Sequence, residues 1–98
     1  MRIPHLIDGR AVESRDCFET LNPTNQQVLA EVAAGGAAAV HAAGAAAKAA
    51  FPKWAATPAA ERAKMMHKLG ELITKHVAEI SAIETGDTGQ TIRQTGKQ

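Results

Sequence analysis

The sequence contains no tyrosine, one tryptophan and two phenylalanines, so the large side chains that usually fill a protein core are scarce. Hydrophobic residues make up 45% of the chain, but alanine supplies much of that fraction. Because an alanine side chain buries little area, a core built from these 98 residues would be thin for its length. We therefore expect the chain to pack against protein that lies outside it.

Cysteine is also scarce, and neither sign of charge dominates. Cys17 is the single cysteine, which excludes a disulfide within the chain and fits a reducing compartment. The 11 basic and 10 acidic residues are interspersed and give a net charge of +1, so no field favours nucleic acid or an anionic membrane. Charges and prolines interrupt every apolar run. A membrane span or a signal peptide needs an uninterrupted apolar run, so the sequence predicts neither. These features predict a cytoplasmic protein with no nucleic-acid and no membrane partner.

Residues that could carry chemistry do not fall into catalytic patterns. Cys17 has no histidine at an informative distance, and we interpret it as a structural cysteine. The four histidines lack the spacing of zinc ligands. The pair Gly35 and Gly36 lacks the G-x-G-x-x-G spacing of a dinucleotide-binding loop. We therefore assign no catalytic and no coenzyme-binding residue to this chain.

Residues 3–34 read as a β-rich segment of three or four short strands. Asp8 and Gly9 lie between short apolar runs, and this dipeptide favours a tight hairpin because both residues tolerate positive φ. The run from Asn22 to Gln26 has strong turn chemistry, and alternating apolar residues follow it from Val28 to Val32. The first third of the chain is thus predicted to form hairpins.

Residues 36–89 read as three helices. The first is rich in alanine and carries Phe51 and Trp54 on one face. Thr57 and Pro58 predict the start of the second, with threonine as the cap and proline in the first turn. A third apolar set follows a break near His76, and this helix is predicted to end at a glycine, either Gly86 or Gly89. The fold class is therefore α+β, a β-hairpin segment followed by three helices.

The run from Glu84 to Gly89 places two carboxylates and two hydroxyls at the expected end of the third helix. Asp87 is disfavoured there, because the helix dipole concentrates negative charge at a C-terminus. Exposed carbonyls beside a carboxylate could bind a hard cation. A capped and solvated helix end is the commoner arrangement. Taken alone, the residues leave both interpretations open.

Six segments, in this order and at these spacings, resemble the N-terminal part of an aldehyde dehydrogenase. They are Leu6 to Gly9, Phe18 to Pro23, Val28 to Val32, Ala50 to Trp54, Pro58 to Arg62 and Glu84 to Gly89. Each segment is weak alone, but together they are specific and cover the chain from His5 to about Lys97. Within the family, Ala50 to Ala55, Lys68 to Ile73 and Ile92 to Thr95 look most similar to bacterial semialdehyde dehydrogenases of aromatic-compound catabolism.

This resemblance implies an NAD- or NADP-dependent oxidation of an aldehyde or semialdehyde to the carboxylic acid. In the family, a cysteine thiolate attacks the carbonyl, hydride passes to the nicotinamide and water hydrolyses the thioester. The residues for these steps are expected beyond residue 98, so Cys17 is not the nucleophile and the chain alone is expected to be inactive. Residues 1–98 would be a single segment, the N-terminal portion of an NAD(P)-binding domain in an α/β fold. Its partners would be the remainder of the enzyme chain and further copies in a homo-oligomer.

The resemblance also implies a monovalent-cation site for K⁺ or Na⁺. Some family members look to bind such an ion through backbone oxygens of a Thr-Leu pair and through an aspartate. The matching positions in this sequence are Thr20, Leu21 and Asp87.

A second hypothesis comes from a different class of protein. The chain could be a free-standing α+β interaction or assembly module without chemistry of its own. The reading frame downstream of Gln98 discriminates between the two, because a continuing frame favours the enzyme and a stop codon favours the module.

Overall fold

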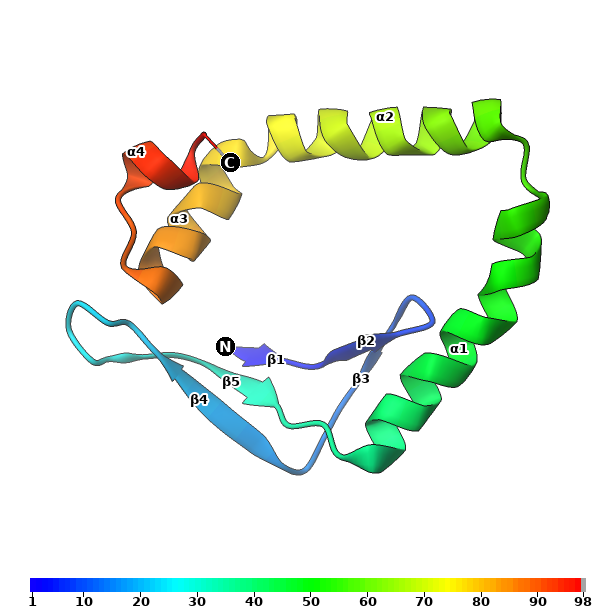
Figure 1. The fold of residues 1–98 in the computed structure, drawn as a ribbon. Coiled ribbons are helices and arrows are strands. Elements are labelled where there is room, and N and C mark those ends of the chain that lie inside the picture. Colours follow the sequence, from blue (N-terminus) through cyan, green and yellow to red (C-terminus); the bar gives the residue numbers. More distant parts are fainter. Residues whose placement is uncertain (98) are drawn as a thin grey trace. The chain divides into compact units, whose positions relative to one another are not determined.

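The computed structural model describes residues 1–97, in which five strands precede four helices (Figure 1). The strands are β1 (Arg2–Ile3), β2 (His5–Ile7), β3 (Arg10–Val12), β4 (Cys17–Leu21) and β5 (Val28–Ala33). The helices are α1 (Ala37–Ala56), α2 (Ala59–Lys75), α3 (Val77–Thr88) and α4 (Ile92–Thr95). The α+β class predicted from the sequence is confirmed.

The chain divides into two compact units, which are described separately. Unit 1 contains Met1–Thr20 and Val28–Ala56. Unit 2 contains Leu21–Gln27 together with the chain from Thr57 onward.

In unit 1, β2 and β3 form the predicted hairpin. His5 pairs with Val12 and Ile7 pairs with Arg10 in antiparallel register. The two turn residues, Asp8 and Gly9, have φ values of 53° and 71°. A two-residue hairpin loop with both φ values positive matches the twist of its strands, and this explains the Asp-Gly pair.

The other three strands of unit 1 form a sheet in the order β1-β5-β4. β1 runs parallel to β5, with Arg2 opposite Glu31, and the Arg2 Nε atom lies 3.6 Å from the Glu31 Oε2 atom. Within residues 1–97, the buried hydrophobic residues are Ala30 and Ala33, both on β5. The core is therefore as thin as the composition predicts.

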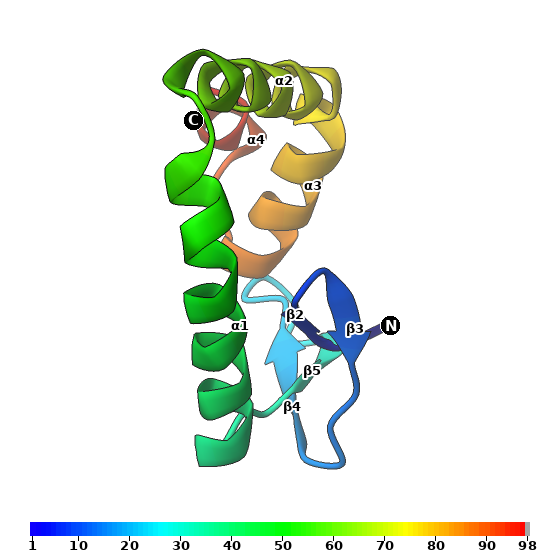
Figure 2. The same cartoon turned by 90° about the vertical axis from the view of Figure 1, so that its right-hand side faces the viewer.

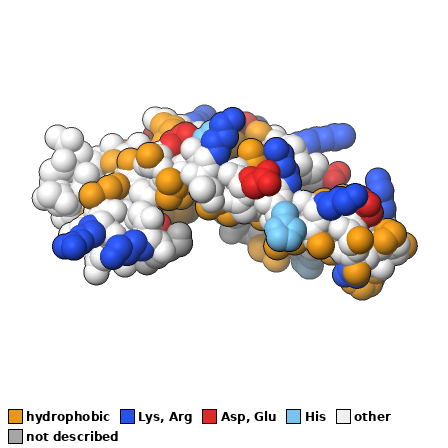
Figure 3. Space-filling model, turned by 90° about the horizontal axis from the view of Figure 1, so that it is seen from above, with side chains coloured by type: hydrophobic (Ala, Val, Ile, Leu, Met, Phe, Trp, Pro, Cys, Tyr) orange, Lys and Arg blue, Asp and Glu red, His pale blue; other side chains and the backbone are white. Residues whose placement is uncertain are grey.

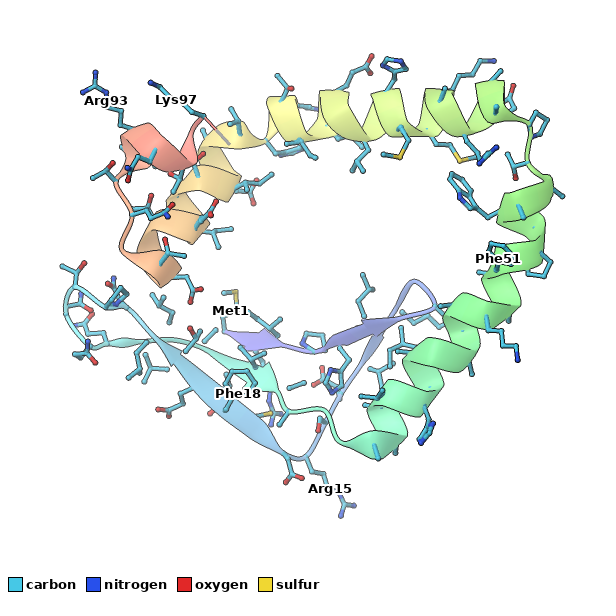
Figure 4. The ribbon with its side chains drawn as sticks, in the orientation of Figure 1. Met1, Arg15, Phe18, Phe51, Arg93 and Lys97 are labelled. Atoms are coloured by element: carbon cyan, nitrogen blue, oxygen red, sulfur yellow. The ribbon has the colours of Figure 1, made fainter. Side chains whose placement is uncertain are left out.

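The start of α1 lies against β2. A Cβ atom added to Gly35 would lie 3.1 Å from the Cε1 atom of His5, so a side chain there would crowd the histidine ring. α1 then continues as one helix through Pro52, which cannot donate a backbone hydrogen bond (Figure 2). No residue of α1 is buried, and Phe51 on this helix is 66% exposed (Figure 4).

In unit 2, α2 begins one residue later than predicted. Pro58 occupies the N-cap position and not the first turn, and it forms no side-chain cap hydrogen bond. The predicted threonine cap is therefore wrong. The carbonyl of Thr57 instead accepts a hydrogen bond from the Arg62 Nε atom at 3.2 Å. Glu61 lies in the first turn, where the helix dipole favours a carboxylate.

The predicted break near His76 separates α2 from α3. His76 has φ −104° and ψ 15°, and its backbone N–H donates to the carbonyls of Leu72 and Ile73. α3 ends at the cap residue Gly89, which has a left-handed backbone with φ 77°. The sequence predicted this end at either Gly86 or Gly89, and the structure places it at Gly89. The short helix α4 follows and was not predicted, because a single turn has no hydrophobic periodicity to detect.

The helices of unit 2 expose large hydrophobic side chains. Met66 is 60% exposed, and a hollow where α2 meets α3 is open to solvent. This hollow is lined by Leu72, Ile73, His76, Glu79, Ile80 and Ile83. Figure 3 views the molecule from the side of α2 and shows charged, histidine and hydrophobic side chains interspersed. Exposed apolar area of this extent is typical of a surface that another part of a protein covers.

We predict that the purified 98-residue chain binds a hydrophobic dye, self-associates or unfolds at low temperature, because its apolar helix faces have no cover. Leu69→Lys should lower the dye fluorescence. The matched change Glu71→Lys, at a position that is already charged, should leave it unchanged. A strict monomer with a sharp cooperative melt at high temperature would contradict this prediction.

Candidate cation site

The turn between β4 and β5 is built by side chains that bind their own backbone. The backbone N–H of Asn22 donates to the Gln27 carbonyl at 2.9 Å, which closes the turn. Inside it, the Asn22 Oδ1 atom accepts from the Thr24 N–H at 2.9 Å, and the Asn25 Oδ1 atom accepts from the Gln27 N–H at 3.0 Å. Such asparagine contacts are the reason that this residue favours turns. The turn predicted from the Asn-Pro-Thr-Asn run is confirmed.

The C-terminus of α3 satisfies part of its own backbone. The Gly89 N–H donates to the Thr85 carbonyl at 3.0 Å, and the Thr88 hydroxyl donates to the Glu84 carbonyl at 2.8 Å. The bond to Thr85 uses one of the four carbonyls that a helix end leaves without a partner in the helix, and the bond to Glu84 lies one residue before these four. Asp87 lies next to the last residue of α3, so its carboxylate sits in the negative end of the helix dipole.

Close packing joins the turn to the end of α3 inside unit 2. A Cβ atom added to Gly89 would lie 3.0 Å from the Cγ atom of Pro23. The residue at position 89 must therefore lack a side chain for two reasons, its positive φ and the proline beside it. The sequence identified Pro23 as a turn residue and Gly89 as a helix cap. It carried no signal that the two residues meet.

The three residues expected at the cation site lie on two segments of the chain, around the β4–β5 turn and at the end of α3. Leu21 and Asp87 both belong to unit 2, on the two segments that Pro23 and Gly89 bring together. Thr20 is the last residue of its segment of unit 1 and is peptide-bonded to Leu21. The donor set of two carbonyl oxygens and a carboxylate consists of hard oxygen ligands, the kind that cations of this class prefer.

Cys17 lies on β4 among groups that hold it in place. Its Sγ atom lies 3.8 Å from the Arg2 Nη2 atom, which donates to it, and donates in turn to the Ser14 carbonyl at 3.6 Å. The pKa of Arg2 is above its ordinary value, chiefly because of this hydrogen bond to Cys17 and then through attraction to Cys17 and Glu31. These contacts agree with the interpretation of Cys17 as a structural residue.

Within residues 1–97, no three histidine, cysteine, aspartate or glutamate side chains gather closely enough to hold a metal ion. No helix in the same range combines the length and the apolar character needed to cross a membrane.

The comparisons with known proteins identify the family. The model of the aldehyde dehydrogenase family matches residues 10–98, so this chain belongs to that family. Over 94 residues it is 51% identical to 5-carboxymethyl-2-hydroxymuconate semialdehyde dehydrogenase of Escherichia coli, covering 96% of this chain and 20% of that enzyme. The resemblance seen in the sequence is thereby confirmed, including its similarity to semialdehyde dehydrogenases.

Solved structures agree with this assignment. The NAD-dependent benzaldehyde dehydrogenase of Corynebacterium glutamicum matches with a TM-score of 0.90 and 38% identity, over 96% of this chain and 21% of its own. A point mutant of betaine aldehyde dehydrogenase from Staphylococcus aureus, solved in complex with NAD⁺, matches with a TM-score of 0.90 and 31% identity, over 96% of this chain and 20% of its own. The chain thus spans about one fifth of the length of the relatives that it matches.

We predict opposite effects of alanine at the two glycines near the end of α3. In an aldehyde dehydrogenase subunit that carries this chain, Gly89→Ala should destabilise by about 1–2 kcal/mol through the left-handed backbone alone, and further through contact with Pro23. Gly86→Ala meets nothing within 4 Å on a helix and should stabilise by roughly 0.5–1 kcal/mol. Urea denaturation measures both changes. Equal stability of the two variants would contradict both the strain expected at the left-handed Gly89 and its contact with Pro23.

Proposed function

We propose that this chain is the N-terminal part of an NAD(P)-dependent aldehyde dehydrogenase subunit that oxidises an aldehyde or semialdehyde to the carboxylic acid. The observation that carries the proposal is the family match over residues 10–98, together with a matching fold in relatives about five times as long. The hypothesis of a free-standing module has no comparable support, since the helix faces of the chain are exposed in the way an incomplete fold would leave them.

The substrate class follows from the relatives. By its name, the Escherichia coli protein acts on 5-carboxymethyl-2-hydroxymuconate semialdehyde, and the Corynebacterium glutamicum protein acts on benzaldehyde. We therefore propose an aldehyde or semialdehyde formed in the catabolism of aromatic compounds as the substrate. NAD is the coenzyme named for the solved relatives, and NADP is the alternative that the family leaves open.

The role of these residues in the subunit is structural. They provide no coenzyme loop, and Cys17 is engaged with Arg2 and Ser14, so no step of the reaction is assigned to them. We propose that the remainder of the subunit covers their exposed helix faces and that the subunit forms homo-oligomers. The free thiol of Cys17 supports a reducing compartment, and we propose the cytoplasm.

The isolated chain should show no NAD(P)-dependent oxidation of any aldehyde, because it lacks a reactive thiolate and a coenzyme site. Absorbance of the reduced coenzyme, followed with a panel of aromatic aldehydes and semialdehydes, measures this. Turnover that survives Cys17→Ser would reveal an active site elsewhere in the chain, and turnover abolished by Cys17→Ser would make Cys17 a catalytic residue.

A chimera provides the positive control for that experiment. The 94-residue match allows this chain to replace the corresponding part of the Escherichia coli enzyme. We expect the chimera to oxidise its semialdehyde, because the chain supplies the same structural element. A chimera that folds into the native oligomer but has no activity would argue against the proposed function.

We further propose that Thr20, Leu21 and Asp87 bind K⁺ or Na⁺. Two observations support this site. Pro23 and Gly89 pack closely, so the turn that follows Leu21 lies beside the helix end that carries Asp87. The carboxylate of Asp87 also lies in the negative end of the α3 dipole, where a cation would compensate it.

Asp87→Ala in the subunit should lower thermal stability and remove its dependence on potassium. When potassium is in tenfold excess over its dissociation constant, the lost stabilisation is about 1.4 kcal/mol. Melting in potassium chloride against choline chloride at constant ionic strength measures it. Glu71→Ala, which removes an exposed carboxylate from α2, is the matched control and should keep the potassium response. A potassium response that persists in Asp87→Ala would exclude this site, and the solvated helix end would then stand.

A further inference from the structure

A buried group of hydroxyls lies between α3 and α4, outside the sites described above. Ser81 and Thr95 are each 3% exposed, and they are the buried polar residues of the described chain. The Thr95 Oγ1 atom lies 3.0 Å from the Thr85 Oγ1 atom, 3.3 Å from the Ser81 carbonyl oxygen and 3.4 Å from the Ile92 carbonyl oxygen. A side chain from α4 is therefore held at two successive turns of α3.

Each hydroxyl of this group has several possible partners. A threonine hydroxyl has one proton, and the carbonyls of Ser81 and Ile92 can only accept. The proton of Thr95 can go to either carbonyl or to Thr85, and at the 3.0 Å contact either hydroxyl can be the donor. Threonine in a helix commonly donates to the carbonyl four residues earlier, as Thr88 does to Glu84. Thr85 instead has its hydroxyl within hydrogen-bond distance of Thr95 on α4.

This arrangement explains why α4 forms. Ile92–Thr95 is a single turn, and an isolated helix of that length is unstable in water because nucleation is unfavourable. The contact from Thr95 to α3 provides the tertiary interaction that holds it. Thr85 also accepts, through its carbonyl, the N–H of Gly89, which packs on Pro23. The hydroxyl pair is thus attached to the same turn of α3 that presents Asp87.

We propose that Thr95 is a positioning residue: with Thr85 it forms a hydroxyl clasp that holds α4 on α3 and fixes the helix end that offers Asp87 to the cation. The positioning role rests on the cation site proposed above. The clasp itself does not, and the two are tested by different measurements.

Hydrogen–deuterium exchange of the peptide spanning residues 89–97, in the full subunit, tests the clasp. Thr95→Val keeps the shape and removes the hydroxyl, and it should speed exchange there by roughly three- to tenfold, the equivalent of one net hydrogen bond. Thr85→Val should have a smaller effect, because Thr95 keeps both carbonyl acceptors. Thr95→Ser should exchange like the unmodified protein. Thr74→Val, which removes a hydroxyl bonded to the Gly70 carbonyl within α2, is the control and should not change this peptide.

The potassium concentration for half-maximal thermal stabilisation tests the positioning role. We expect Thr95→Val to raise this concentration severalfold, and Thr95→Ser and Thr74→Val to leave it unchanged. A merely structural loss would lower the melting temperature equally at every potassium concentration. Unchanged exchange in Thr95→Val would overturn the clasp. Faster exchange with an unchanged potassium midpoint would overturn the positioning role. No potassium response in the unmodified subunit would overturn the cation site and the positioning role together, while the exchange result would still decide the clasp.

Discussion

The contact between Pro23 and Gly89 is the constraint on which the organisation of unit 2 depends. It brings the turn after β4 to the end of α3, segments more than sixty residues apart in the chain. The contact exists because position 89 has no side chain and has a positive φ, which only glycine adopts without strain. The helix end, the asparagine-rich turn and the candidate cation ligands are all arranged around this one place.

The same unit shows how polar groups replace a hydrophobic core. Apart from two alanines of β5, the buried residues of the described chain are Ser81 and Thr95. Each buried hydroxyl costs free energy unless it forms a hydrogen bond, so such a group specifies one arrangement of its helices where apolar contacts would allow several. The large hydrophobic residues meanwhile stay exposed on α1, α2 and α3. The chain spans about one fifth of the length of its relatives. In such a segment we expect the polar groups to make contacts within the segment and the exposed hydrophobic side chains to contact the rest of the fold.

Features encoded over a few neighbouring residues could be predicted from the sequence. The hairpin at Asp8 and Gly9, the turn after Asn22, the break at His76 and the glycine cap are all local, because each depends on the φ preference or the side-chain hydrogen bonds of residues within a few positions. The threonine cap at Thr57 was wrong for a related reason. The proline that follows can occupy either the cap or the first turn, and the sequence does not distinguish them.

The sequence by itself determined the family and the α+β class, because motif spacing and residue type carry that information directly. Only the tertiary structure decided that Pro23 meets Gly89, that Thr95 binds two turns of α3, and that a one-turn helix forms after Gly89. The residues that meet in these features are not linked by any regular spacing in the sequence. They depend on the close approach of two segments, which a pattern within either segment does not encode.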